Sequence, residues 1–234
     1  MKKVLILVLS HLSPPYASLM RVSRETWDSV DIDGVQTIFY LGKVEFPADP
    51  KVLTTSAEDT FFNMGRKDLD AFQWAIDNSD FDFIARVNSS CYVNKKMLLE
   101  YCQTLPTENM MSGVECAHQS GGTYLWGGTQ YIISRDAIQK ILDHKDKWNH
   151  ELMEDEAMCL VSKEAGIDWH KAMRSCSIDK ANNGWTLISY GGKSVSFKEF
   201  SELKDDEHVF FRVKYDSDRK KDLWIMRELF KSLK

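Results

Sequence analysis

The chain has 234 residues, of which 43% are hydrophobic and 12% aromatic, and its formal net charge is −5. This composition provides a sizeable core and excludes wholesale disorder, and the length fits one large domain or two small ones at about 150 residues per domain. The negative charge disfavours a nucleic-acid binder, because such proteins gain most of their affinity by neutralising phosphates.

The cysteines and the N-terminus point to a soluble cytoplasmic protein. The five cysteines show no CxxC spacing, which favours reduced, buried thiols over a zinc site. The apolar run Val4–Leu9 is short for a signal peptide, whose apolar region spans about 7–15 residues, and no later stretch approaches the ~20 residues of a membrane span. We therefore expect no membrane span, and the oligomeric state stays open.

Strands and helices alternate along the chain. Apolar runs predict strands at 3–10, 35–42, 81–87, 110–115 and 128–134, and helices at 16–30, 68–78, 95–102, 135–144 and 154–166. Ser56 and Asp59 resemble a capping box, and Asn94 is a candidate helix cap. A late strand at 208–215 precedes an amphipathic helix at 222–233. The alternation predicts an α/β domain with a central, mainly parallel mixed sheet flanked by helices, whose ligands bind at the carboxyl ends of the strands.

Four segments of the sequence resemble conserved segments of the β1,3-galactosyltransferase and fringe group of glycosyltransferases, in the same order. They are MRVSRETW at 20–27, FDFIARVNSSCYVN at 81–94, GGTQYIISRDA at 127–137 and LMEDEAMCLVSKEAGI at 152–167. The resemblance covers roughly residues 1–175, and the last 60 residues match nothing in that group. It implies a single GT-A-like domain over 1–234, with a nucleotide-sugar-binding half (1–115) and an acceptor-binding and basic half (116–234).

One departure from that group concerns the metal. Its metal-binding aspartates align with Asn88, Ser89 and Ser90, which are neutral. Divalent cations such as Mg²⁺ and Mn²⁺ prefer charged oxygen ligands. We therefore expect no metal site and no required cofactor, although a divalent metal is not excluded. Either the activity has been lost or other groups supply the positive charge.

Arg212 and Lys214 are the candidates for that charge. They stand two apart on a predicted strand, so their side chains share a face. Fixed cations can stabilise a departing nucleoside diphosphate, and the arrangement is similar to that of the metal-independent core-2 β1,6-N-acetylglucosaminyltransferases. The alternative is a solvated basic strand edge. Residues 209–234 hold eight basic and four acidic side chains, so the first 208 residues carry a net charge of −9.

The resemblance also implies roles for residues at the strand exits and helix starts. Asp155 matches the group's catalytic aspartate, a general base, with Glu154 and Glu156 as fallbacks; the alternative is an ordinary acidic first helical turn. Arg24 either contacts the donor or pairs with a carboxylate. The remaining candidates, each with an ordinary structural alternative, are Ser10, His11, Asn88, Ser89 and Ser90 for the donor and Trp126, Gly127, Gly128 and Glu154 for the acceptor sugar.

The resulting hypothesis is an enzyme, an inverting hexosyl- or pentosyltransferase. It moves a sugar from a nucleotide sugar, most simply a UDP-sugar, to a glycan hydroxyl, without a metal and with Arg212 and Lys214 on the diphosphate. Its partners are the donor and a carbohydrate acceptor. The alternative is a non-catalytic relative that binds a glycan or nucleotide and lost its activity together with the aspartates.

Overall fold

The computed structural model describes residues 1–117, 123–171, 174–190, 192–205, 207–215 and 219–233. Its centre is a seven-stranded sheet in the order β3-β2-β1-β4-β7-β6-β8. Every neighbouring pair is parallel except the two pairs that β7 makes, so only β7 runs against the others. The strands are β1 (Val4–Leu9), β2 (Val35–Leu41), β3 (Val52–Thr54), β4 (Phe83–Asn88), β6 (Met110–Ala117), β7 (Thr123–Ser134) and β8 (Asp168–Lys171).

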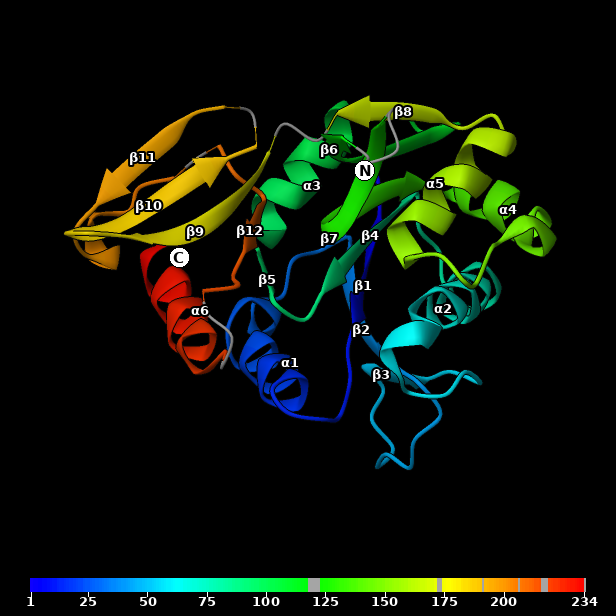
Figure 1. The fold of residues 1–234 in the computed structure, drawn as a ribbon, viewed down its shortest axis with the longest axis horizontal. Helices are drawn as coiled ribbons and strands as arrows, with labels where there is room; N and C mark the ends of the chain where they lie inside the picture. The colour runs from blue at the N-terminus through cyan, green and yellow to red at the C-terminus, as the bar shows by residue number, and fades with distance from the viewer. Residues whose placement is uncertain (118–122, 172–173, 191, 206, 216–218, 234) are drawn as a thin grey trace.

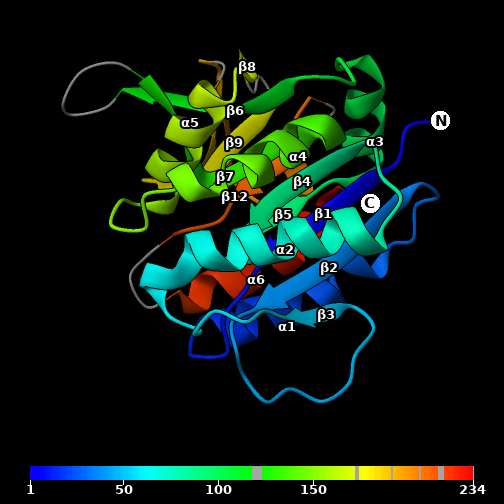
Figure 2. The same cartoon turned by 90° about the vertical axis from the view of Figure 1, so that its right-hand side faces the viewer.

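Helices cover both faces of this sheet, as the sequence predicts (Figures 1 and 2). Along β1, Val4, Ile6 and Val8 join one buried cluster while the alternate leucines join the other, because successive side chains of a strand point to opposite faces. One face is covered by α2 (Met64–Asn78), α4 (Arg135–Asp143) and α5 (Glu154–Glu164), and the other by α1 (Tyr16–Glu25) and α3 (Lys95–Thr104). No helix of the described residues is long and apolar enough to cross a membrane.

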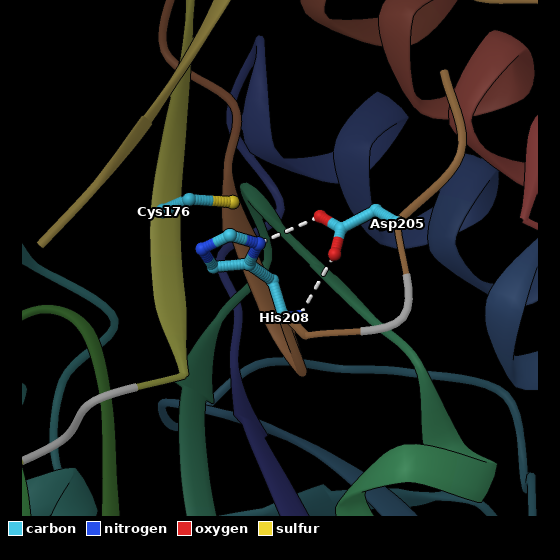
Figure 3. A group of neighbouring side chains, drawn as sticks. All are labelled: Cys176, Asp205 and His208. Carbon is cyan, nitrogen blue, oxygen red and sulfur yellow. Dashed lines mark hydrogen bonds and ion pairs between the residues drawn. The ribbon is translucent and has the colours of Figure 1, made fainter. Parts of the chain in front are cut away.

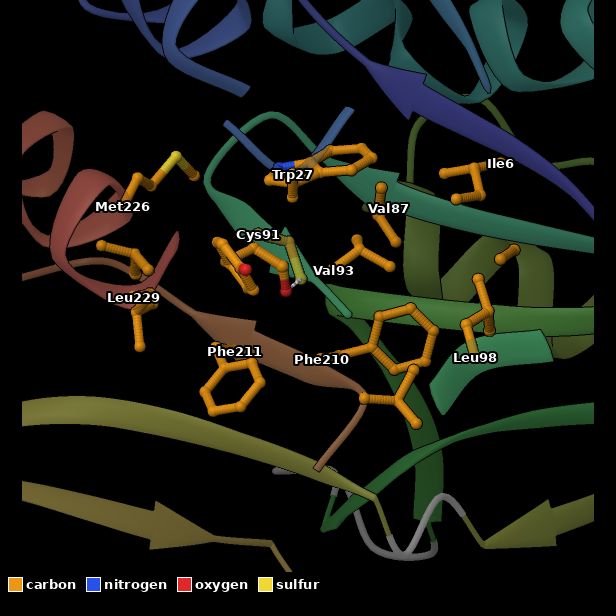
Figure 4. Close-up of a cluster of buried hydrophobic side chains, with 14 of the residues drawn as sticks. Ile6, Trp27, Val87, Cys91, Val93, Leu98, Phe210, Phe211, Met226 and Leu229 are labelled. Atoms are coloured by element: carbon orange, nitrogen blue, oxygen red, sulfur yellow. Dashed lines mark hydrogen bonds between the residues drawn. The ribbon is translucent and has the colours of Figure 1, made fainter. Parts of the chain in front are cut away.

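A second sheet, which the sequence does not predict as such, lies beside the α1 and α3 layer (Figure 1). Its order is β11-β10-β9-β12-β5, and α6 (Lys220–Ser232) packs next to it. Phe210 and Phe211 of β12 and Met226 and Leu229 of α6 belong to one buried apolar cluster (Figure 4). Its strands are β5 (Cys91–Val93), β9 (Ser175–Ala181), β10 (Gly184–Ser189), β11 (Ser194–Phe197) and β12 (Phe210–Arg212).

Several predicted boundaries change. The strand expected at 208–215 is only β12, so Lys214 lies beyond its end. Asp59 caps no helix, since α2 begins at Met64. The cap at Asn94 is confirmed, because its side chain accepts a hydrogen bond from the backbone N–H of Met97 at 3.2 Å. Short 3₁₀ turns occupy Trp27–Ser29, Phe61–Asn63, Lys145–Lys147 and Phe200–Glu202, and the first of them replaces the last turn expected for the helix at 16–30.

An irregularity in β7 shapes the edge where the ligand is expected. Gly113 of β6 pairs with Tyr131, but the next residue, Val114, pairs with Trp126. The four residues 127–130 are therefore extra on the β7 side, in the manner of a β-bulge, which commonly re-aims side chains beside a site. The backbone carbonyls of Gly127 and Gly128 thereby come within reach of Asn88 at the carboxyl end of β4.

Candidate functional site

A cavity of about 400 Å³ opens at the carboxyl ends of β1 and β4. Its size lies within the usual range for small-molecule sites, about 300–1,000 Å³, and its position is the one expected for an open α/β sheet. Twelve of the thirteen residues singled out from the sequence line it. They are Ser10, His11, Asn88, Ser89, Ser90, Trp126, Gly127, Gly128, Glu154, Asp155, Arg212 and Lys214.

Arg24 is the exception. Its Nη1 lies 2.7 Å from Oδ2 of Asp49, and its guanidinium packs over the ring of Phe39. Of the two roles expected for Arg24, the structure shows the ion pair with a carboxylate. Arg24 does not line the cavity, so a contact with the donor is not supported, and the residue serves as a control position.

Four lysine and arginine side chains line the cavity. The guanidinium of Arg212 lies 5.5 Å from the ring centroid of Trp126 and donates from Nη1 to the carbonyl of Gly128. Its Nε is buried and has no hydrogen-bond partner within the described ranges. Burial, and the nearby charge of Arg219, lower the pKa of Arg212, yet a guanidinium stays protonated in proteins. We call these four side chains, Lys67, Arg212, Lys214 and Arg219, the cationic wall.

The buried Lys67 is held at the exit of β1. Its Nζ donates to Oδ1 of Asp59 at 2.9 Å and to the carbonyl of Ser10 at 3.3 Å. Burial acts to raise the pKa of Asp59, but its hydrogen bond from Lys67 and others outweigh burial and lower it. The backbone N–H of Ser13 donates to Nδ1 of His11, so Nε2 carries the proton and donates to the carbonyl of Asp59. These bonds fix the position of both side chains beside the cavity.

The donor set at Asn88–Ser90 does not fit a divalent cation. Oδ1 of Asn88 accepts a hydrogen bond from Nη1 of Arg86 at 3.0 Å, and Nδ2 donates to the carbonyls of Gly127 and Gly128, both at 3.2 Å. Both N–H groups of the amide and one acceptor site of its oxygen are thus used by the protein. Ser89 and Ser90 offer only neutral hydroxyls, and the cavity that they line also holds Arg212. We therefore derive no step of the chemistry through a metal.

A buried ion network, not foreseen from the sequence, lies behind the cavity. Nη2 of Arg86 lies 3.1 Å from Oε2 of Glu154 and 3.2 Å from Oδ2 of Asp68. These distances are those of ion pairs, but the angles are not those of hydrogen bonds. The hydroxyl of Tyr40 donates to Asp68. Burial raises the pKa of Glu154 well above its usual range, although Arg86 opposes this. One cation thus faces two carboxyl groups, and burial favours the protonated form of Glu154.

Asp155 stands at the start of α5 and lines the cavity half-buried. Its Oδ2 accepts a hydrogen bond from the backbone N–H of Gly127 at 3.4 Å, and its Oδ1 accepts one from Glu156 at 3.1 Å. Burial raises the pKa of Asp155, and these two backbone bonds oppose it. A carboxylate of raised pKa, oriented from two sides, has the character of a general base.

A second group of chemically reactive side chains lies away from the cavity, between β9 and the loop before β12 (Figure 3). Cys176, Asp205 and His208 place potential metal ligands within 4.8 Å of one another. However, Nδ1 of His208 donates to Asp205 at 2.7 Å, and the thiol of Cys176 donates to the carbonyl of Phe210 at 3.6 Å. Burial raises the pKa of the Cys176 thiol, which keeps it neutral. These hydrogen bonds use the potential ligand atoms within the protein, so the group has a structural role in holding the loop before β12.

Comparison with known proteins shows the fold. No family model matches the sequence, and no curated protein matches it. A solved glycosyltransferase involved in the glycosylation of the major capsid of PBCV-1 is similar over 96% of this chain and 99% of its own, with a TM-score of 0.54 and 11% identity. The chain shares the fold of this glycosyltransferase. The mixed α/β architecture with a mainly parallel central sheet flanked by helices, predicted from the sequence, is thereby confirmed.

Two more distant structures cover about three quarters of the chain. The 4-diphosphocytidyl-2C-methyl-D-erythritol synthase of Anaerococcus prevotii is 9% identical, covers 73% of this chain and 86% of its own, and has a TM-score of 0.47. The glycosyltransferase GlyE of Streptococcus pneumoniae is 11% identical, covers 74% of this chain and 46% of its own, and has a TM-score of 0.45. One fold can carry many activities, so the function depends on the chemistry of the site.

Proposed function

We propose that this protein transfers a sugar from a nucleotide sugar to a hydroxyl group of a glycan, with inversion at the anomeric carbon and without a metal. The observation that carries the proposal is the presence, in one cavity, of the cationic wall and the carboxylate of Asp155. A nucleotide sugar brings a diphosphate that needs positive charge, and an acceptor hydroxyl needs a base.

The cationic wall has positive charge to spare for a diphosphate. Lys67 and Arg219 are paired with Asp59 and Asp222, whereas Arg212 and Lys214 have no carboxylate of the described residues within 4.0 Å. Arginine binds phosphate through its planar fork and lysine acts as a point charge. In our proposal Arg212 and Lys214 stabilise the negative charge that develops on the leaving diphosphate.

The remaining lining groups would orient the donor. Ser89 and Ser90 offer hydroxyls beside the ribose or the phosphates, next to the locked amide of Asn88. Ser10 and His11, at the exit of β1, would meet the nucleotide base. UDP is the nucleotide that we expect, in line with the family resemblance of the sequence.

The chemical step follows from the position of Asp155. The acceptor oxygen attacks the anomeric carbon from the face opposite the diphosphate and forms the new glycosidic bond. The bond between that carbon and the diphosphate oxygen breaks, and the electron pair leaves with the diphosphate. Asp155 takes the hydroxyl proton, and its raised pKa suits it to this task better than that of an ordinary aspartate.

Titration calorimetry with UDP in excess EDTA tests the donor site. We expect wild-type protein to bind, and Arg212→Ala to weaken binding by about tenfold to a hundredfold, because a hydrogen bond between charged groups is lost. Lys214→Ala removes an exposed charge and costs less. Arg24→Ala, the matched control outside the cavity, leaves the affinity unchanged. Equal affinities of wild type and Arg212→Ala would refute the assignment.

The second candidate function is a non-catalytic binder of a nucleotide or glycan. The neutral side chains of Asn88, Ser89 and Ser90 favour it, because they stand where the resemblance places acidic metal ligands. Incubation with a panel of radiolabelled UDP-sugars separates the two. An enzyme releases UDP from its donor sugar, and the Asp155→Asn substitution abolishes this release. A binding module binds UDP or a glycan but releases no UDP from any UDP-sugar.

A further inference from the structure

A second cavity, of about 220 Å³, adjoins the first. The two share Phe61, Met64, Met153 and Glu154 in their linings, so they lie side by side. The second cavity lies between the 3₁₀ turn that precedes α2 and the segment that leads into α5. Asp155, the proposed base, lines the first cavity and follows directly on two of the shared residues, Met153 and Glu154.

Exposed apolar side chains gather at this place. Nine large hydrophobic side chains are exposed within the described ranges, and five of them line one or both cavities: Tyr16, Phe61, Phe62, Leu152 and Met153. Phe62 is 87% exposed and Phe61 is 55% exposed, and their rings meet edge to face. An exposed patch of this kind marks a surface that binds something, because isolated exposed apolar residues are common but clusters are not.

Two stacked aromatic rings, Trp148 and His150, line the second cavity. Trp148 is only 5% exposed and packs against the backbone of Gly65, where an added Cβ would come within 2.6 Å of its Nε1. The ring of His150 stacks on Trp148, with centroids 6.4 Å apart. Trp148 therefore needs a glycine in α2, and the aromatic surface exists before any ligand arrives.

The second cavity differs from the first in charge, because it lacks the cationic wall. Glu151, Glu154 and Glu156 line it, and no lysine or arginine of the described residues does. Burial, helped by the charge of Arg66, lowers the pKa of His150, which favours its neutral form at pH 7. An anionic occupant would meet three glutamate side chains here and none of the cationic wall. A neutral polyol meets hydrogen-bond acceptors for its hydroxyls and aromatic faces for its C–H surfaces.

We propose that this second cavity is the acceptor subsite and that it takes an uncharged glycan. The proposal rests on the proposed glycosyl transfer, because it places the acceptor beside Asp155 and the donor on the cationic wall. Phe61 and Phe62 stack on the sugar, Trp148 forms the floor, and Glu151 and Glu156 accept hydrogen bonds from its hydroxyls. This set extends the acceptor residues expected from the sequence, Trp126, Gly127, Gly128 and Glu154, away from the diphosphate.

Ligand-observed NMR tests the subsite directly. The probes are neutral methyl hexosides and methyl pentosides at tens of millimolar, together with the corresponding methyl uronides, each with and without saturating UDP. We expect at least one neutral glycoside to bind and its uronide to bind more weakly. Phe62→Ala lowers the affinity about three- to tenfold, the range of one lost aromatic contact. Leu160→Ala, on α5 outside both cavities and 53% exposed, is the matched control and changes nothing.

Each outcome decides something. The proposal is overturned if no neutral glycoside binds wild-type protein, if uronides bind as well as their neutral partners, or if Phe62→Ala and Leu160→Ala behave alike. Phe62 touches no buried core, so its removal leaves the fold intact, and unchanged UDP affinity of Phe62→Ala confirms this. Failure of UDP to bind wild-type protein, while the glycosides still bind through Phe62, would instead refute the donor site and leave the subsite standing.

Discussion

Two parts of the site, the cationic wall and the acidic side that leads into α5, are built in different ways. The cationic wall is assembled from distant parts of the chain, with Lys67 on α2 and Arg212, Lys214 and Arg219 near the C-terminus, and its cations are held partly by bonds to backbone carbonyls. The acidic side is one continuous segment, from Trp148 to Glu156, with carboxyl groups and exposed aromatic and apolar neighbours. A site that must hold an anion and activate a neutral hydroxyl needs such a separation of charge, and in our proposal this site achieves it without a metal.

The largest effect on the transfer rate is expected from a substitution that changes only the acidic side. Asp155→Asn keeps the size of the side chain and one of the two backbone hydrogen bonds, because its amide has a single acceptor oxygen, and it removes the proton acceptor. We expect the rate of sugar transfer to fall by about 100- to 10,000-fold, the usual contribution of a general base. UDP affinity should stay within twofold of wild type, because the cationic wall is untouched.

The rate and UDP affinity are measured on the same preparation. A rate of Asp155→Asn near the wild-type value would move the base elsewhere, with Glu156 as the next carboxylate to replace.

Arg86 joins the two sides, so its loss should affect both. It contacts Asn88 and Gly127 next to the cationic wall and Glu154 on the acidic side, with a fully buried side chain. We expect Arg86→Met to lower the free energy of unfolding by about 3–5 kcal/mol, because buried carboxyl groups lose their counter-ion. Urea unfolding at pH 7 measures this.

The matched control is Arg227→Ala, whose partner Glu25 is half exposed and whose loss should cost about 1 kcal/mol or less. Equal losses of unfolding free energy in the two variants would contradict the claim that Arg86 stabilises the fold through its buried ion pairs.

A smaller effect should follow from the proton on Glu154. A carboxyl group whose pKa is raised on folding stabilises the fold below its unfolded pKa and loses this contribution as pH rises through the folded pKa. Glu154→Gln mimics the protonated form, so at pH 6–7 we expect it to change the free energy of unfolding by less than about 1 kcal/mol.

Stability curves from pH 5 to 9 give the sign. Wild type should lose stability relative to Glu154→Gln as the pH rises, and a large loss in the variant at pH 6 would mean that Glu154 is ionised against Arg86.

The sequence predicts the main sheet and most of the cavity because the signals are local. The apolar runs of β1 and β4 identify buried strands, and the residues that follow them, Ser10 and Asn88, then meet at one edge. Arg212 and Lys214 do line one cavity, but not for the reason expected, since β12 ends at Arg212 and a shared strand face does not apply.

What escaped prediction depends on contacts between distant segments. The second sheet is made of short strands, several of them polar, such as β9 and β11, whose pairing gives no periodic signal. Arg86 sits inside the apolar run at 81–87, and a charge in a buried strand is a signal that can mark an ion network from sequence alone. Phe61 and Phe62 look like ordinary core residues until the fold leaves them exposed.

The central claim is that the cationic wall replaces a metal. The direct measurement is the initial rate of transfer from a UDP-sugar to a neutral glycan, in excess EDTA and again after saturation with Mn²⁺. We predict rates that agree within twofold, with Arg212→Ala slow in both conditions. A rate that disappears in EDTA and returns with Mn²⁺ would contradict the account.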